Sequence, residues 1–344
     1  MLQVCPVIYG GTKVLKENPP CLVAENVTFL PSVFAGTGAE LFYPSGRVVA
    51  ESLSYRGIPS PHLPLGATYT EADLTQFPRA PEEYHYVYLG DVNQHYGHFL
   101  IGALSRLWRF PALEREKLRL VFTGQPSVEA LFEKEYMRQI WQALELKPEN
   151  FAFFPKGARF KEIEVSGASF EENSHVHQIY SEMMVALGAK IYPEEIQEKP
   201  NRIVYFTKEF LPNGIWRLQN EAVLSEGLRS LGIEIVAPER LSLQAQIKLW
   251  KEGGVFIATS SSALHSSAFV ANRKIIVLNN VSEMWSNQVL VDRVSHNDSL
   301  YLYDFENFDY KAGFVEGFHA QLEIKNQERF VSELLSFLKA LKAK

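Results

Sequence analysis

The sequence predicts an α/β protein whose C-terminal half contains a parallel sheet covered by helices on both faces. Two observations support this fold class. Short apolar runs alternate with stretches of helical spacing between residues 202 and 278, which is the pattern of strands joined by crossover helices. Glycines end the expected helices, as Gly232 does after 220–231 and Gly253-Gly254 do after 242–250. Strands connected in this way lie parallel and are buried on both faces.

The expected elements change in character along the chain. Residues 1–85 are rich in Pro, Gly and β-formers and predict short strands and turns. Residues 86–195 predict a first Rossmann-like α/β domain, and 200–325 predict a second one after the polar, proline-flanked linker 192–200. The expected strands are 26–30, 46–50, 84–89, 118–123, 151–154, 163–165, 202–207, 233–236, 255–258 and 274–278. The expected helices are 97–110, 127–144, around 183–187, 220–231, 242–250 and 263–270, with an amphipathic helix over 326–344 that we expect to pack back on the N-terminal domain.

Composition limits the function classes. The 344 residues are 46% hydrophobic and 22% charged, which is ordinary for a globular protein with room for two cores. A net charge of −6 provides no basic footprint for nucleic acid. Two cysteines form neither a disulfide framework nor a metal cluster. No apolar run approaches the ~18 residues of a membrane span, and the N-terminus lacks the features of a signal peptide. We therefore expect a bacterial cytoplasmic protein.

The stretch from Val255 to Phe269 carries the strongest functional signal. An apolar strand runs into the small hydroxyl residues 259–262, and helical spacing follows. Such a strand–turn–helix directs free backbone N–H groups and a positive helix end at an anion. A nucleotide-sugar pyrophosphate fits this position, with Ser260, Ser261, Ser262, Ala263, Leu264 and His265 as donor-binding candidates. The alternative is a well-capped helix in an ordinary α/β domain.

A second constellation lies between a strand and a helix start, and contains Asp91, His95, Tyr96 and His98. A helix N-terminus disfavours imidazolium and so favours a neutral imidazole that can accept a proton. His95 and His98 face one another if the helix starts early. A metal site needs a third ligand that the neighbouring sequence does not supply. The alternative is that both histidines only cap and pack.

A third constellation follows the strand 202–207. Arg217 precedes a helix start at Asn220-Glu221, and arginine binds phosphate in a bidentate manner. Asn220 is an N-cap candidate, and Glu221 favours the first helical turn. Glu221 is also a candidate for binding a ribose or sugar hydroxyl. The alternative is a charged surface loop.

Four motifs in a fixed order carry a resemblance to a known family. In this chain they are Tyr96-Gly97-His98-Phe99-Leu100 with Arg106-Leu107-Trp108; Arg217 with Asn220-Glu221; Gly232 with Val236-Ala237-Pro238-Glu239-Arg240-Leu241-Ser242 and Gln246; and Ser261-Ser262-Ala263-Leu264-His265-Ser266 with Phe269. With these motifs the chain resembles the family-61 glycosyltransferases, a group often described in bacteria as capsular polysaccharide biosynthesis proteins. The resemblance covers roughly residues 84 to 280.

The resemblance implies a GT-B architecture, in which two Rossmann-like domains face one another across a cleft, here with the β-rich N-terminal extension. It implies an inverting transfer of a hexosyl or pentosyl group from a nucleotide sugar, expected to be UDP-linked, to a glycan or lipid-linked glycan. The C-terminal half then binds the donor, and the motif residues Glu239 and Gln246 join the donor-binding candidates. The acceptor side contains His95 and Tyr96, with His98 as the base and Asp91 as its runner-up or orienting partner.

No Asp-x-Asp motif occurs, so we expect no metal or other cofactor, and protein groups must stabilise the leaving diphosphate. A non-catalytic nucleotide- or sugar-binding protein on the same fold stays open, because fold does not determine function and Ser261 stands where the family commonly has glycine. A peripheral contact of the C-terminal helix with the inner membrane also stays open. The oligomeric state, the sugar and the acceptor are not specified by these motifs.

Overall fold

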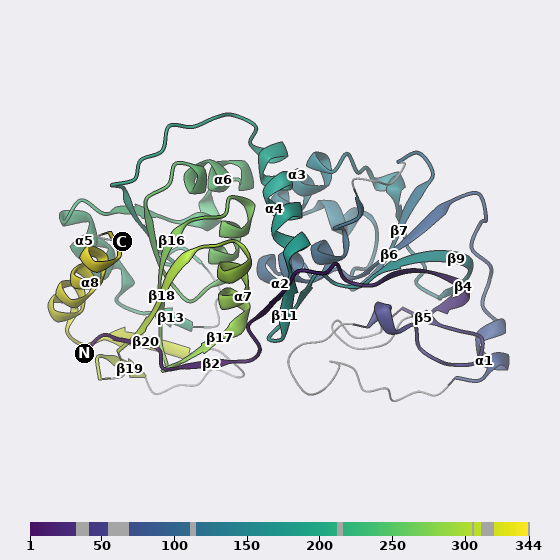
Figure 1. The fold of residues 1–344 in the computed structure, drawn as a ribbon, viewed down its shortest axis with the longest axis horizontal. Helices are drawn as coiled ribbons and strands as arrows, with labels where there is room; N and C mark the ends of the chain where they lie inside the picture. The colour runs from purple at the N-terminus through teal and green to yellow at the C-terminus, as the bar shows by residue number, and fades with distance from the viewer. Residues whose placement is uncertain are drawn as a thin grey trace. The chain divides into compact units, whose positions relative to one another are not determined.

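The computed structural model describes residues 1–31, 41–53, 69–110, 115–211, 216–304, 306–310 and 320–342. The chain divides into two compact units, Met1–Tyr9 with Tyr192–Lys344 and Gly10–Ile191 (Figure 1). We call the first the C-terminal unit and the second the N-terminal unit. The chain leaves the N-terminal unit at the start of the polar segment 192–200.

The C-terminal unit is built mainly from alternating strands and helices. Its elements are β1 (Gln3–Val4), β2 (Val7–Tyr9), β12 (Ile203–Phe206), β13 (Trp216–Leu218), α5 (Glu221–Ser230), β14 (Glu234–Val236), η6 (Pro238–Arg240), α6 (Leu243–Lys251), β15 (Val255–Thr259), η7 (Ser262–Phe269), β16 (Lys274–Asn279), β17 (Glu283–Trp285), α7 (Ser286–Val294), β18 (Asp298–Tyr303), β19 (Phe308–Tyr310), β20 (Ala320–Ile324) and α8 (Gln327–Lys342). The η elements are 3₁₀ helices.

The main sheet of this unit has the order β1-β18-β16-β15-β12-β14, and all its pairs are parallel except β1 with β18. Side chains alternate between two cores. Tyr205 and Ile257 pack with α5 and α8 on one face, whereas Phe206 and Phe256 pack with α6, η7 and α7 on the other. The sheet is therefore covered on both faces, as the uninterrupted apolar strands predict.

The strand order reverses at β12. The chain passes from β12 through α5 to the edge strand β14, and then returns through α6 to β15 on the opposite side of β12. Because parallel crossovers are right-handed, connections that run in opposite directions place their helices on opposite faces. Gly254 makes the return possible: its φ is +102°, and a Cβ there would lie 2.4 Å from the Arg202 carbonyl oxygen.

The C-terminal helix α8 packs within its own unit. Its apolar stripe, Phe330, Leu334 and Leu338, is buried in the same core as Leu224 and Leu228 of α5, and Figure 1 shows the two helices side by side. The expectation that this helix also packs back on the N-terminal domain stays a prediction. The amphipathic pattern correctly predicts a buried stripe, but it cannot identify the partner surface.

The N-terminal unit combines strands from both halves of its sequence. Its elements are β3 (Lys13–Leu15), β4 (Cys21–Phe29), β5 (Leu41–Phe42), η1 (Ala50–Ser52), α1 (Glu71–Thr75), β6 (His85–Asp91), α2 (Tyr96–Ile101), η2 (Ala103–Arg106), β7 (Leu118–Thr123), η4 (Glu129–Phe132), α3 (Glu135–Ala143), η5 (Pro148–Asn150), β8 (Phe151–Ala152), β9 (Ala158–Ser166), β10 (Phe170–Glu171), β11 (His175–His177) and α4 (Gln178–Ile191).

Its main sheet is mixed, with the order β5-β4-β9-β6-β7-β8. The long strand β4 pairs antiparallel with β9 from Cys21 to Phe29, and β9 pairs parallel with β6. Residues 10–85 therefore belong to the same unit as the α/β segment. Residues 1–9 join the C-terminal unit through β1 and β18.

Three expected helices and one expected strand differ from the structure. The helix over 97–110 ends at Ile101 and restarts as η2 after Gly102, whose N–H donates to the His98 carbonyl at 2.8 Å. The helix over 127–144 is divided into η4 and α3, and that over 263–270 is the 3₁₀ helix η7. The strand over 46–50 is reduced to one bridge, Phe42 with Val48. Tertiary packing overrides weak local preferences in these segments. In the described part of the chain, no helix has the length and apolar character needed to cross a bilayer.

Candidate functional site

Two loops meet at the carboxyl edge of the C-terminal sheet, one after β12 and one after β15. The register pairs Phe206 with Ala258, so the residues that continue the two strands lie next to one another. The Lys208 Nζ donates a hydrogen bond of 2.9 Å to the Ser260 backbone carbonyl. This contact marks the point where the strand order reverses, which is where open α/β sheets bind their ligands.

The Lys208 ammonium lies in an environment that disfavours its charge. Burial lowers its pKa to about 8, and the nearby Glu221 carboxylate partly opposes this effect. Glu221 is only 3% exposed, and its Oε1 accepts the Lys208 backbone N–H at 3.0 Å and the Tyr205 hydroxyl at 2.8 Å. A desolvated ammonium interacts strongly with an incoming anion. Lys208 is therefore a candidate phosphate-binding group, and the hydrogen bonds of Glu221 hold the loop that carries it.

The turn after β15 begins with Ser261 at the N-cap position of η7, in extended backbone and without a side-chain cap hydrogen bond. The Ser260 N–H donates to the Leu278 carbonyl at 2.9 Å, which ties the turn to β16. Leu264 is fully buried in the core. Among the candidates in this stretch, Ser262 and Ala263 thus supply the first backbone N–H groups of the 3₁₀ helix, which have no acceptor within it.

His265 is held by a buried hydrogen-bond chain. Its Nδ1 lies 2.9 Å from the Gln288 Oε1, and the Gln288 Nε2 donates to the Asp292 Oδ1 at 2.8 Å. Asp292 also accepts the Tyr301 hydroxyl at 2.7 Å. Because the amide of Gln288 donates to a carboxylate, its oxygen must face His265, so Nδ1 carries the imidazole proton. Burial raises the pKa of the Asp292 carboxyl, and these hydrogen bonds oppose that change.

Two motif residues make hydrogen bonds that support the fold. The Asn220 Nδ2 donates to the Ile324 carbonyl at 2.8 Å and its Oδ1 accepts the Ile324 N–H at 3.1 Å. Asn220 occupies the N-cap position of α5, as predicted, but its side chain makes no cap hydrogen bond because it bonds the Ile324 backbone instead. The Gln246 Nε2 donates to the Pro238 carbonyl at 3.0 Å, and its Oε1 lies 3.4 Å from the Ser266 hydroxyl. Gln246 therefore connects η6 to η7.

The other two donor candidates lie on neighbouring elements. Arg217 is in β13, which pairs with β20, and its side chain is half-buried. Glu239 is in η6, and burial raises the pKa of its carboxyl, whereas backbone hydrogen bonding and the charge of Arg240 lower it. Neither Arg217 nor Glu239 is among the residues that line the cavity described next.

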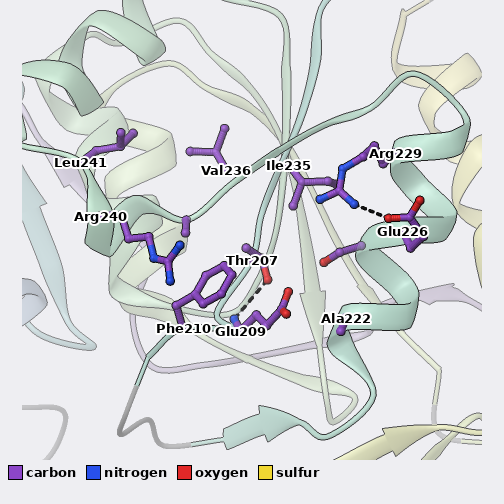
Figure 2. A pocket seen from close by; sticks show the side chains of 12 residues that line it. Thr207, Glu209, Phe210, Ala222, Glu226, Arg229, Ile235, Val236, Arg240 and Leu241 are labelled. Carbon is purple, nitrogen blue, oxygen red and sulfur yellow. Dashed lines mark hydrogen bonds and ion pairs between the residues drawn. The ribbon is translucent and has the colours of Figure 1, made fainter.

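A cavity of about 560 Å³ lies beside the Lys208 loop, within the C-terminal unit (Figure 2). The residues after β12, one side of α5 from Ala222 to Arg229, and the segment from β14 through η6 to Leu241 form its walls. Its lining residues are Thr207, Glu209, Phe210, Ala222, Ser225, Glu226, Arg229, Ile235, Val236, Ala237, Arg240 and Leu241. The volume lies in the range of small-molecule sites. The sequence motifs did not identify this cavity, because its residues come from three separate segments.

The second constellation belongs to the N-terminal unit. His98 lies in α2, and its Nδ1 is 3.1 Å from the Glu172 Oε1. The His95 ring lies 5.1 Å from the His98 ring, so the two imidazoles do approach one another, because α2 starts at Tyr96 and makes His95 its N-cap. The Tyr96 ring packs edge-on against Tyr136 at 5.0 Å. Glu172, which sequence reasoning missed, is the carboxylate that contacts His98.

Asp91 ends β6 in the same unit. Burial raises the pKa of its carboxyl, and the charge of His98 lowers it. Its Oδ1 is buried and accepts no hydrogen bond from any residue that the structure describes. A Cβ at Gly124, where φ is +79°, would lie 2.1 Å from this oxygen, so a glycine is needed there. Across the described ranges, no three His, Cys, Asp or Glu side chains are placed to hold a metal ion.

A comparison with known families identifies the group to which the chain belongs. The family model named Glycosyltransferase 61 matches residues 96–277, more than half of the chain. The chain belongs to glycosyltransferase family 61. The match begins at Tyr96 and ends within β16, so it includes α2 with His98, the Lys208 loop and η7. No curated protein shows a significant match to the chain. As a family-61 member, the protein is a transferase that acts on a sugar donor and an acceptor.

Proposed function

We propose that this glycosyltransferase moves a hexosyl or pentosyl group from a UDP-linked sugar to a hydroxyl of a glycan or glycolipid, with inversion at the anomeric carbon. The observation that carries the proposal is the contact between Lys208 and Ser260 at the strand switch point. It brings a partly desolvated ammonium beside the first turn of η7. A leaving diphosphate needs positive groups of this kind, arranged before the reaction begins.

The donor end of the proposed site uses the C-terminal unit. The ammonium of Lys208 and the backbone N–H groups of Ser262 and Ala263 bind the diphosphate. Buried His265 supports the same turn through its contact with Gln288. We keep Arg217 as a further phosphate ligand, and Glu239 as a donor-binding residue. In this scheme protein groups carry out the charge stabilisation, and transfer proceeds without a metal cofactor.

The proposed base is His98 of the N-terminal unit. With Nδ1 donating to Glu172, the imidazole presents Nε2 as its proton acceptor. The acceptor hydroxyl gives its proton to Nε2 as its oxygen forms a bond to the anomeric carbon. The bond from that carbon to the diphosphate oxygen breaks on the opposite face, and the bonding electrons leave with UDP. Glu172 then stabilises the imidazolium, in the way a carboxylate orients and supports a general-base histidine.

The remaining parts of the proposal come from the family resemblance. We propose a GT-B enzyme of bacterial surface polysaccharide synthesis that works in the cytoplasm or at the inner membrane. His95 and Tyr96 then belong to the acceptor side, with Asp91 as a second carboxylate near the base. A non-catalytic binding protein is the competing function, and it shares the donor site but not the chemistry.

The test is nucleotide release by the purified full chain. The protein is incubated with UDP-linked, GDP-linked and CMP-linked sugars, with and without EDTA, and free nucleotide is quantified. We expect slow hydrolysis of one UDP-sugar that persists in EDTA. Loss of activity in EDTA would refute metal independence. Tight nucleotide binding without release, even with glycan acceptors present, would favour the non-catalytic alternative.

A further inference from the structure

The cavity beside Lys208 contains a buried hydroxyl without a partner. Ser225 of α5 lines the cavity, is 2% exposed, and its Oγ makes no hydrogen bond to any described residue. Buried polar groups are nearly always hydrogen-bonded, and leaving one unsatisfied costs about 1–3 kcal/mol. A serine inside a helix usually donates back to the carbonyl four residues earlier. The Ser225 hydroxyl is therefore ready to bond a polar ligand atom inside the cavity.

Two planar groups, the Phe210 ring and the Arg240 guanidinium, form part of the cavity wall. The Arg240 guanidinium lies 3.4 Å from the centre of the Phe210 ring, and Figure 2 shows the two side chains next to one another at the cavity. Phe210 is 44% exposed even with Arg240 stacked on it, which is unusual for a large aromatic residue. Aromatic rings and guanidinium planes are the surfaces on which planar heterocycles stack.

Charge in the cavity is balanced. Two carboxylates, Glu209 and Glu226, and two guanidinium groups, Arg229 and Arg240, lie on its walls. Arg229 forms an ion pair with Glu226 on α5 (Figure 2). A balanced cavity with apolar walls suits a neutral, polar molecule better than a phosphate. Lys208 does not line the cavity, but it lies between the lining residues Thr207 and Glu209 in the chain, and its ammonium bonds the Ser260 carbonyl.

We propose that this cavity binds the nucleoside of the donor, with the base stacked on Phe210 and Arg240 and the Ser225 hydroxyl bonded to a polar group of the nucleoside. This inference rests on the proposed function, in which the donor is a nucleotide sugar. The volume of about 560 Å³ accommodates a nucleoside. The phosphates then leave the cavity towards Lys208 and the start of η7. In this arrangement the cavity binds the nucleoside, whereas Lys208 and the start of η7 bind the phosphates. Separate substitutions can therefore test the two parts of the site.

The experiment measures binding of two probes to the full chain by calorimetry. The first probe is a nucleoside diphosphate, selected from UDP, GDP, ADP and CDP by the wild-type protein, and the second is inorganic pyrophosphate. We expect Phe210→Ala to weaken nucleotide binding about 5- to 150-fold, the range that base stacking on an aromatic ring supports, and to leave pyrophosphate binding unchanged. Ser225→Ala should weaken the nucleotide alone, about 3- to 10-fold. Lys208→Met should weaken both probes.

A matched control lies on the same helix. Val223 of α5 is 62% exposed and is not a lining residue, so Val223→Ala should leave both affinities unchanged. Phe210→Leu, which keeps an apolar side chain but removes the plane, should lose most of what Phe210→Ala loses. Ser225→Cys tests the hydroxyl with little change in volume if the alanine variant is poorly folded, because a thiol is only a weak donor.

Three results separate the two proposals. If the nucleotide binds and Lys208→Met weakens it, but the Phe210 and Ser225 variants bind normally, the nucleoside lies elsewhere. The cavity assignment then fails while the proposed function stands. If Phe210→Ala weakens pyrophosphate as much as nucleotide, the variant has disturbed the loop and the stacking assignment also fails. If no nucleoside diphosphate binds the wild-type protein, the nucleotide-sugar donor itself is wrong.

Discussion

Substituting Lys208 by methionine is predicted to make the protein more stable relative to wild type near neutral pH than at high pH. The substitution should also weaken the affinity for diphosphate. Methionine is about as long as the lysine stem but has no charge to desolvate. The ammonium of Lys208 has its pKa lowered from 10.5 to about 8, with burial as the larger cause. A group that titrates differently in the folded and unfolded chain makes stability depend on pH.

The direction of the pH dependence of stability follows from the protonation of Lys208 in the folded and unfolded states. Below about pH 8 the lysine is charged in both states, so the folded chain carries the full desolvation cost. Between about pH 8 and 10.5 the folded state loses this proton before the unfolded state does, and the cost disappears. A pKa shift of this size corresponds to about 3 kcal/mol, at 1.36 kcal/mol per pKa unit. Because the side chain is partly exposed, we reduce the expected pH-dependent difference to roughly 1–3 kcal/mol.

Urea unfolding at about pH 7 and about pH 10 measures this difference. The free energy of unfolding of wild type, relative to Lys208→Met, should rise by roughly 1–3 kcal/mol between the two pH values. Subtracting the variant removes the contribution of every other titrating group. Loss of the hydrogen bond to Ser260 changes the offset between the proteins but not its pH dependence. Lys248→Met, on the exposed side of α6, is the control and should leave the pH dependence unchanged.

The affinity for diphosphate depends on pH in the opposite direction to the stability. The charged ammonium is the form that attracts diphosphate, so pyrophosphate affinity of wild type should fall as pH rises above about 8, and the variant should show no such fall. A relative stability that stays constant from about pH 7 to about pH 10 would refute the desolvation argument. An unchanged pyrophosphate affinity in Lys208→Met would remove this residue from the site.

Three further predictions address the base and the fold. His98→Ala should reduce transfer at least about 100-fold, the usual contribution of a general base, while calorimetry shows unchanged nucleotide affinity; full turnover would exclude His98 as the base. Glu172→Ala should lower kcat roughly 10- to 100-fold by removing a charge-assisted hydrogen bond, and a kcat equal to wild type would show that Glu172 does not orient the imidazole. Gly254→Ala should destabilise the protein by about 2 kcal/mol or more, because its Cβ would lie 2.4 Å from the Arg202 carbonyl oxygen. Gly227→Ala, inside α5 with nothing within 4 Å of its Cβ, should instead stabilise it by ~0.5–1 kcal/mol, and equal urea midpoints for the two variants would contradict the strain argument.

Local periodicity predicted the elements β12, α5, β14, α6, β15, β16 and α8 of the C-terminal unit, but not α7 or the main-sheet strand β18. The strands around Val204, Phe256 and Ile276 were recognisable as short apolar runs, since a strand buried on both faces consists mostly of apolar residues. The same reasoning was wrong for η7, because a block of small residues followed by apolar spacing fits a 3₁₀ helix and an α-helix equally well. In the 3₁₀ helix both Leu264 and Phe269 are buried.

The sequence by itself determined the fold class, the family and the order of the motif segments along the chain, because these depend on residue types at short spacings. Only the tertiary structure decided which residues meet. The register of β12 with β15 brings Lys208 to Ser260, and the turn after β10 brings Glu172 to His98. The cavity lined by Phe210 and Ser225 likewise gathers three segments. Contacts between distant segments depend on register and packing across the whole unit, and no local pattern encodes them.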